Sequence, residues 1–165
     1  NEYGAETIVR VTGDNPLTDP EIILSMLKSH NENKSEYTYV SSLPIGTSAE
    51  VIDVAALKRS KREWTDPNSS EYMTYMLQRA DKIKQNEFTV ECQALNRTEL
   101  RLTVDTPKDY HCMNLIYEHF IGFLPGLIEI IELLDSSPKI KQVESRENLV
   151  SLPDHIDCSY IGDKL

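Results

Sequence analysis

Two aspartates follow similar short segments at distant points of the sequence. The segment RVTGD ends at Asp14, and the segment RLTVD ends 91 residues later at Asp105. In both cases a proline stands two residues further on, and a helical pattern follows. Two carboxylates at one point supply the hard oxygen ligands that Mg²⁺ binds together with water and phosphate. The spacing is therefore compatible with a magnesium site, but capping aspartates are common, so the alternative that each aspartate caps the helix after it stays open.

The two aspartates can meet only if neighbouring elements of one sheet carry them. Residues 7–11 are a β-branched run typical of a buried strand, and residues 100–104 repeat this composition. In open α/β sheets, ligands bind beyond the carboxyl ends of the strands, which is where both aspartates stand. Thr18, or Asp19 beside it, is expected to cap the first helix, and Thr106 the second, which leaves the aspartates free for a ligand.

The remaining patterns alternate between strands and helices, which predicts an α/β protein with a mostly parallel sheet, flanking helices and one antiparallel pair around Asn96. Further strands are expected at 37–42, from 49 to about 53 and at 87–95, and further helices from about 53 to 64, at 69–84, 126–137 and 138–143. One domain is predicted, with a loosely structured polar tail at 144–165.

The composition excludes several classes of protein. A formal net charge of −10 argues against a nucleic-acid partner, which calls for basic patches. No apolar run approaches the roughly 18 residues of a membrane span. The three cysteines are scattered and form no CxxC pair, so free thiols in the cytoplasm are expected.

Several motifs taken in order resemble a known family. The sequence contains IVRVTGDNPLTDP, then YVSS and LPIGTSAEVIDVAAL, then EYMT, and then LRLTVDTPKDY. This series resembles the SpsF-type cytidylyltransferases, which are related to CMP-sialate and CMP-Kdo synthetases and share the glycosyltransferase-A nucleotide-binding fold. The family's R-x-x-S-x-R-L-P-x-K loop has no counterpart here, so residues 1–143 would be the C-terminal part of such a domain and the fold would be partial.

The resemblance implies roles for individual residues. Asp14 and Asp105 would be carboxylate ligands of Mg²⁺ near the CTP phosphates. Glu50 would face the pocket of the acceptor sugar, and Gly46 would let the backbone come close to it. Glu71 would begin the helix that lines the far side of the site.

Few cationic side chains are available near the expected site. Arg10 and Arg101 are the candidates for substrate contacts, and the alternative is that each forms an ion pair at the sheet edge. His30 and His119 stand where helices are expected to end, and a cation there suits the helix dipole.

By this resemblance the chain is expected to belong to a Mg²⁺-dependent enzyme that couples CMP from CTP to an acidic or polysaccharide-precursor sugar and releases pyrophosphate. Without the missing loop, the isolated chain is expected to turn over CTP poorly or not at all. The alternative is a non-catalytic binding or assembly module derived from the same fold. A homodimer is also possible, because an incomplete sheet leaves strand edges to cover.

Overall fold

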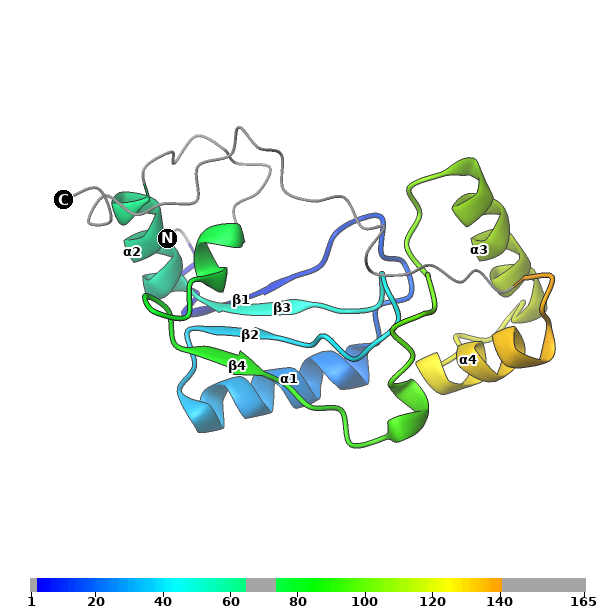
Figure 1. Cartoon of the computed structure of the whole chain (residues 1–165), viewed down its shortest axis with the longest axis horizontal. Coiled ribbons are helices and arrows are strands. Elements are labelled where there is room, and N and C mark those ends of the chain that lie inside the picture. Colours follow the sequence, from blue (N-terminus) through cyan, green and yellow to red (C-terminus); the bar gives the residue numbers. More distant parts are fainter. Residues whose placement is uncertain (1–2, 65–73, 141–165) are drawn as a thin grey trace.

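A computed structural model describes residues 3–64 and 74–140, which form a four-stranded sheet with helices beside it (Figure 1). No helix in these two ranges is long and apolar enough to cross a membrane. The elements in chain order are β1 (Thr7–Arg10), α1 (Pro20–Asn33), β2 (Tyr37–Tyr39), β3 (Glu50–Asp53), α2 (Val54–Glu63), the 3₁₀ helix η2 (Tyr75–Gln78), β4 (Gln85–Glu87), the 3₁₀ helix η3 (Gln93–Leu95), α3 (Pro107–His119) and α4 (Leu127–Ser136).

The strand order in the sheet is β1-β3-β2-β4. β3 is antiparallel to both of its neighbours, β1 and β2, and only β2 and β4 run parallel. The α/β class is therefore confirmed, but the expectation of a mostly parallel sheet is wrong for the described strands. The register pairs Arg10 of β1 directly with Glu50 of β3, and this pairing shapes the site described below.

Helix α1 covers one face of the sheet (Figure 1). Asp19 caps its first turn by accepting a hydrogen bond from the backbone N–H of Glu21, so Asp19, not Thr18, is the cap. Its buried residue Met26 joins a core that also contains Val51 of β3. Since successive side chains of a strand point to opposite faces, the residues next to Val51 face away from α1.

His30 near the end of α1 is buried and its Nδ1 lies 2.8 Å from the hydroxyl oxygen of Thr38 on β2. Burial lowers the pKa of His30, while the nearby charge of Asp53 acts in the opposite direction. The expected cation at this helix end is therefore wrong for His30, because a buried, hydrogen-bonded imidazole is favoured in its neutral form.

The opposite face of the sheet has a second core at one end. Tyr37 and Ile52 pack there with Trp64, Met76 and their neighbours. Asp53 ends β3 and caps α2 by accepting from the backbone N–H of residue 56, which is where the sequence predicted the change from strand to helix. The sheet is thus covered by α1 on one face and partly by α2 and η2 on the other.

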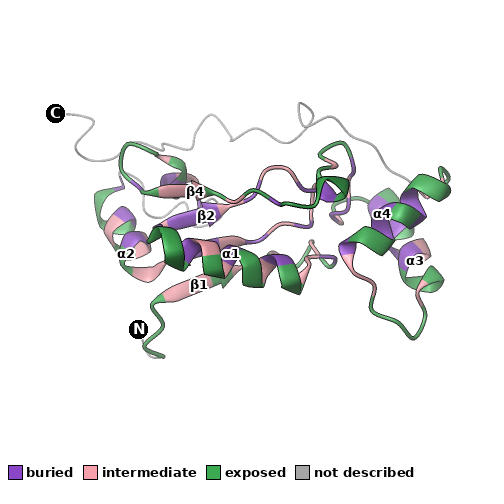
Figure 2. Ribbon diagram, turned by 90° about the horizontal axis from the view of Figure 1, so that it is seen from below, coloured by how far each residue is buried: buried purple, intermediate pink, exposed green. Residues whose placement is uncertain are grey.

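Helices α3 and α4 lie together at one end of the sheet (Figures 1 and 2). Thr106 and Asp109 form the predicted capping box at the start of α3, and both partners' hydrogen bonds are present. Buried side chains on both helices, such as Ile116 and Leu134, belong to the same core as Met26 of α1. The capping box therefore fixes where α3 begins relative to the segment that carries Asp105.

Three expected elements differ from the structure. The expected strand at 87–95 is replaced by β4, which lies at 85–87, and by η3. The expected strand at 100–104 is reduced to a single parallel bridge between Ile45 and Arg101. Of the helix expected at 69–84, the described residues contain only the short η2. The tail at 144–165 and Glu71 lie outside the described residues.

Candidate functional site

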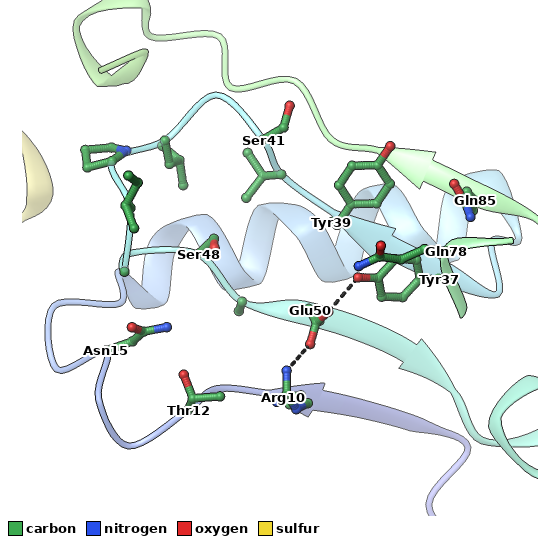
Figure 3. A pocket seen from close by; sticks show the side chains of 16 residues that line it. Arg10, Thr12, Asn15, Tyr37, Tyr39, Ser41, Ser48, Glu50, Gln78 and Gln85 are labelled. Carbon is green, nitrogen blue, oxygen red and sulfur yellow. Dashed lines mark hydrogen bonds and ion pairs between the residues drawn. The ribbon is translucent and has the colours of Figure 1, made fainter. Parts of the chain in front are cut away.

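A pocket of about 570 Å³, which we call the sheet-face pocket, lies over the sheet on the face away from α1 (Figure 3). It is bounded by residues of all four strands, by the loop after β1, by the loop between β2 and β3, and by η2. The residues that line it are Arg10, Thr12, Asn15, Tyr37, Tyr39, Val40, Ser41, Leu43, Pro44, Ile45, Gly46, Ser48, Ala49, Glu50, Gln78 and Gln85. Three residues proposed from the sequence, Arg10, Gly46 and Glu50, are thus brought together in one pocket.

Glu50 lies between Arg10 and Tyr37 at the floor of the pocket (Figure 3). Its Oε2 is 2.5 Å from Nη1 of Arg10, and its Oε1 accepts a 2.5 Å hydrogen bond from the Tyr37 hydroxyl. Because the three side chains come from adjacent strands and face the same side, the register of the sheet fixes this triad. The ion-pair interpretation of Arg10 is confirmed, although its side chain remains 32% exposed.

The phenol of Tyr37 is held in its neutral form. Its ring is buried, and burial together with the negative charge of Glu50 raises its pKa far above the usual value. A neutral phenol is a hydrogen-bond donor, and here it donates to the Glu50 carboxylate. Glu50 therefore receives one charged and one neutral donor, which hold its carboxylate in a fixed orientation.

The other polar side chains that line the pocket are uncharged. The ring of Tyr39 stacks on that of Tyr37 with centroids 5.5 Å apart. Ser41 donates a hydrogen bond to Glu87, and the amide of Gln85 donates to the carbonyl of Leu77. Sequence reasoning missed the tyrosines as site residues, although the alternation in YTYVSS places the two rings on one face of a strand.

Gly46 lines the pocket. It was expected to let the backbone come close to the acceptor sugar, but its closest neighbours are backbone atoms of this chain. Its φ is +88°, and a Cβ atom there would lie 2.4 Å from the backbone N of Thr103 and 2.7 Å from the carbonyl carbon of Leu102. The close approach that glycine permits is thus to another part of this chain. It lets the loop between β2 and β3 pack directly against residues 101–103.

The segments that carry the two aspartates are hydrogen bonded to each other. The backbone carbonyl of Asp14 accepts a 2.8 Å bond from the N–H of Val104 and a 3.3 Å bond from the hydroxyl of Thr103. Asp105 is the next residue after Val104, so the two aspartates belong to adjacent backbone segments. Asn15, directly after Asp14, lines the pocket.

Neither aspartate caps a helix. Asp19 caps α1, and Thr106 with Asp109 caps α3. The side chain of Asp14 is exposed, and that of Asp105 is 49% exposed and lies 2.5 Å from Nη2 of Arg101. The capping alternative is therefore wrong for both residues, and the Asp105 carboxylate is held beside Arg101.

Arg101 joins Asp105 to the start of α3. Its Nε and Nη2 also bond Asp109, at 3.1 and 3.2 Å. Burial alone would raise the pKa of Asp109, but hydrogen bonds from Arg101, from the backbone N–H groups of Asp105 and Thr106, and from the Thr106 hydroxyl lower it to about 2. Asp109 is thus a charged, buried anchor that fixes the guanidinium next to Asp105. Arg101, like Arg10, is in an ion pair.

Comparison with known proteins identifies similar chains. A family model described as cytidylyltransferase matches residues 1–144. An uncharacterised protein of Methanocaldococcus jannaschii is 29% identical over 143 residues, which cover 87% of this chain and 59% of that protein. The spore coat polysaccharide biosynthesis protein SpsF of Bacillus subtilis is 30% identical over 134 residues, which cover 79% of this chain and 55% of SpsF.

A solved structure of a cytidylyltransferase from Leptospira borgpetersenii serovar Hardjo-bovis superposes with a TM-score of 0.75. The match covers 92% of this chain and 63% of that one, at 24% identity. It confirms the expected cytidylyltransferase-like fold. In all three comparisons this chain spans less than two thirds of the length of the protein it matches.

Proposed function

We propose that this chain is part of an enzyme that transfers CMP from CTP to a sugar. The proposal starts from the fact that the chain belongs to the cytidylyltransferase family. The sugar would be an acidic sugar or a polysaccharide precursor, and pyrophosphate would be the second product. The name of the B. subtilis relative, a spore coat polysaccharide biosynthesis protein, supports a polysaccharide precursor.

One observation supports this proposal most strongly. In a chain that matches the family model over residues 1–144, the backbone carbonyl of Asp14 accepts a hydrogen bond from the N–H of Val104, directly before Asp105. Two carboxylates on adjacent segments, neither used as a helix cap, fit an ion that takes its other ligands from water and phosphate. The described residues contain no cluster of three or more histidine, cysteine or acidic side chains that could hold a metal alone.

Asp14 and Asp105 would therefore hold Mg²⁺ together with the triphosphate. When bound, Mg²⁺ neutralises phosphate charge and keeps the reacting oxygens in line. Arg101 lies 2.5 Å from Asp105 and is fixed in turn by Asp109, so it would hold that carboxylate in place. The protein's contribution would be positioning and electrostatics, and no covalent intermediate with the protein is required.

The sheet-face pocket would hold the acceptor. In the reaction, a sugar hydroxyl oxygen forms a bond to the α-phosphorus of CTP, and the bond from that phosphorus to the bridging oxygen breaks. Pyrophosphate leaves with the electron pair, and the hydroxyl proton passes to solvent. Arg10 and Glu50 would orient the sugar through its hydroxyl groups, since a fixed ion pair presents both a donor and an acceptor.

The direct test is turnover by the full-length protein. CTP, Mg²⁺ and a panel of sugars are incubated with wild type and with Asp14→Asn, and pyrophosphate and a new phosphodiester are followed by ³¹P NMR. We expect a CMP-sugar product that requires Mg²⁺ and falls at least about a hundredfold in the variant, as for loss of a group that stabilises the transition state. A protein that binds sugar but neither binds nor consumes CTP would contradict the proposal and favour a binding module.

A further inference from the structure

One group of polar side chains in the sheet-face pocket already has partners within the chain. Glu50 bonds Arg10 and Tyr37, and Ser41 donates to Glu87 beside the pocket. A ligand that approaches these side chains must compete with bonds that the folded chain has already made. This part of the pocket is therefore held in place by the chain itself.

A second group has no such partners. The side chains of Thr12, Asn15 and Ser48 line the pocket and are half-buried, and they make no hydrogen bond to any residue that the structure describes. Figure 3 shows them on the side of the pocket away from Tyr37 and Gln78. A polar ligand can bond these three side chains in exchange for water, without breaking a bond within the chain. They are thus the groups best placed to hold one.

The backbone of Asn15 is fixed in a tight turn. Its N–H donates to the carbonyl of Thr12 at 3.1 Å, and its own carbonyl accepts from the N–H and from the hydroxyl of Thr18, at 3.3 and 2.9 Å. The side-chain amide remains available to a ligand, while the backbone that carries it is held. A group on a fixed backbone loses little conformational freedom when it binds, which favours precise positioning.

Asn15 also lies at the junction of the two proposed binding regions. It follows Asp14 directly, so the two Cα atoms are about 3.8 Å apart. Asp14 is the proposed ligand of the ion that holds the phosphates, whereas Asn15 lines the pocket proposed for the acceptor. A ligand group bonded to Asn15 is therefore next to the phosphates. A carboxamide both donates and accepts hydrogen bonds, as a hydroxyl group does, so the two are suited to each other.

We propose that Thr12, Asn15 and Ser48 form the subsite for the reacting hydroxyl group of the acceptor, and that Asn15 positions its oxygen. The Oδ1 of Asn15 accepts the hydroxyl hydrogen, which leaves a lone pair of that oxygen for the α-phosphorus of CTP. The amide takes no proton: as the new O–P bond forms and the bond to pyrophosphate breaks, the proton passes to solvent. The inference rests on the proposed function and deepens it, and it applies to acidic and neutral sugars alike.

The first test observes the Asn15 amide directly. The full-length protein is labelled with ¹⁵N and loaded with Mg²⁺ and α,β-methylene-CTP, which cannot release pyrophosphate, and Asn15→Ala identifies the side-chain resonances of Asn15. N-acetylneuraminate, Kdo, glucose and galactose are then added in turn. We expect a sugar that binds to shift the Asn15 amide beyond the shift caused by the nucleotide. The amide of Asn31, exposed on α1 at the other face of the sheet, should not move.

The second test separates positioning from stability. With a sugar that the wild type turns over, Asn15→Ala should lower kcat by about ten- to a hundredfold, as expected when a reacting group is misplaced. The dissociation constant of CTP in the presence of Mg²⁺ should stay unchanged. The thermal midpoint should stay within about 2 °C of wild type, because the amide that is removed makes no bond to the described residues. Asn31→Ala is the matched control and should leave all three quantities unchanged.

Four results would overturn the inference: no sugar of the panel shifts the Asn15 amide, kcat of Asn15→Ala equals that of wild type, kcat falls only together with the thermal midpoint, or the variant loses affinity for CTP. The last result would place Asn15 at the phosphates instead. CTP turnover that does not respond to Asn15→Ala contradicts this inference alone, whereas a wild type that neither binds nor consumes CTP contradicts the proposed function.

Discussion

Replacing Gly46 by alanine places a methyl group where the backbone of residues 102–103 already lies. The new Cβ would be 2.4 Å from the N of Thr103 and 2.6 Å from its Cα, and both are backbone atoms that cannot turn aside. An alanine at φ +88° also costs about 1–2 kcal/mol by itself. Overpacking in a well-packed site typically costs a further ~1–3 kcal/mol. We therefore expect Gly46→Ala to destabilise the protein by about 2–5 kcal/mol.

Thermal unfolding followed by far-UV circular dichroism measures this loss. At roughly 2–4 °C per kcal/mol for a protein of this size, the midpoint should fall by about 4–20 °C. Gly13→Ala is the matched control, because a Cβ there meets nothing within 4 Å and its φ lies outside the left-handed region. That variant should stay within about 2 °C of wild type. A similarly small shift for Gly46→Ala would refute the close contact between the pocket wall and the segment leading to Asp105.

Two predictions concern pH. Hydrogen bonds lower the pKa of Asp109 to about 2, and at pH values above about 4 they stabilise the folded state by about 2 kcal/mol. This stabilisation is lost as the pH falls from about 4 towards 2. Urea unfolding should therefore show that Asp109→Asn has a lower free energy of unfolding than wild type at pH 7, and that this difference becomes smaller at low pH. A difference that does not change with pH would contradict the lowered pKa of Asp109. Burial lowers the pKa of His30, so its ring binds a proton more readily in the unfolded protein. The free energy of unfolding should therefore decrease as the pH falls below about 6.5. NMR titration of its ring should give a midpoint below that value, and His30→Gln should remove this part of the pH dependence; a midpoint at or above it would show that the ring is not desolvated.

Local features of the fold could be predicted from the sequence because short-range chemistry determines them. The cap and first turn of α1, the change from strand to helix at Asp53, and the capping box of Thr106 and Asp109 all depend on residues within four positions of one another. Proline at the start of α1 and α3 adds to these signals. The ion-pair alternative for Arg10 and Arg101 was also open to sequence reasoning.

Strand direction and register could not be predicted in this way. Alternation of apolar and polar residues is the same in a parallel and an antiparallel strand, so no local sequence pattern indicates that β3 is antiparallel to its neighbours. The pairing of Arg10 with Glu50 depends on that placement across 40 residues. The segment 100–104 has the composition of a strand but makes a single β-bridge. The residues that contact it, Gly46 and Asp14, lie in loops, so no neighbouring strand continues the ladder there.

The proposed reaction depends on one ion shared by Asp14 and Asp105. Binding of Mn²⁺, as a paramagnetic substitute for Mg²⁺, can be measured by electron paramagnetic resonance in the presence of CTP for wild type, Asp14→Asn, Asp105→Asn and the double variant. If the carboxylates hold the same ion, each single variant should lose nearly as much affinity as the double variant, because residues that share one partner are not additive. Undiminished Mn²⁺ binding in either single variant, or strictly additive losses, would contradict a shared site.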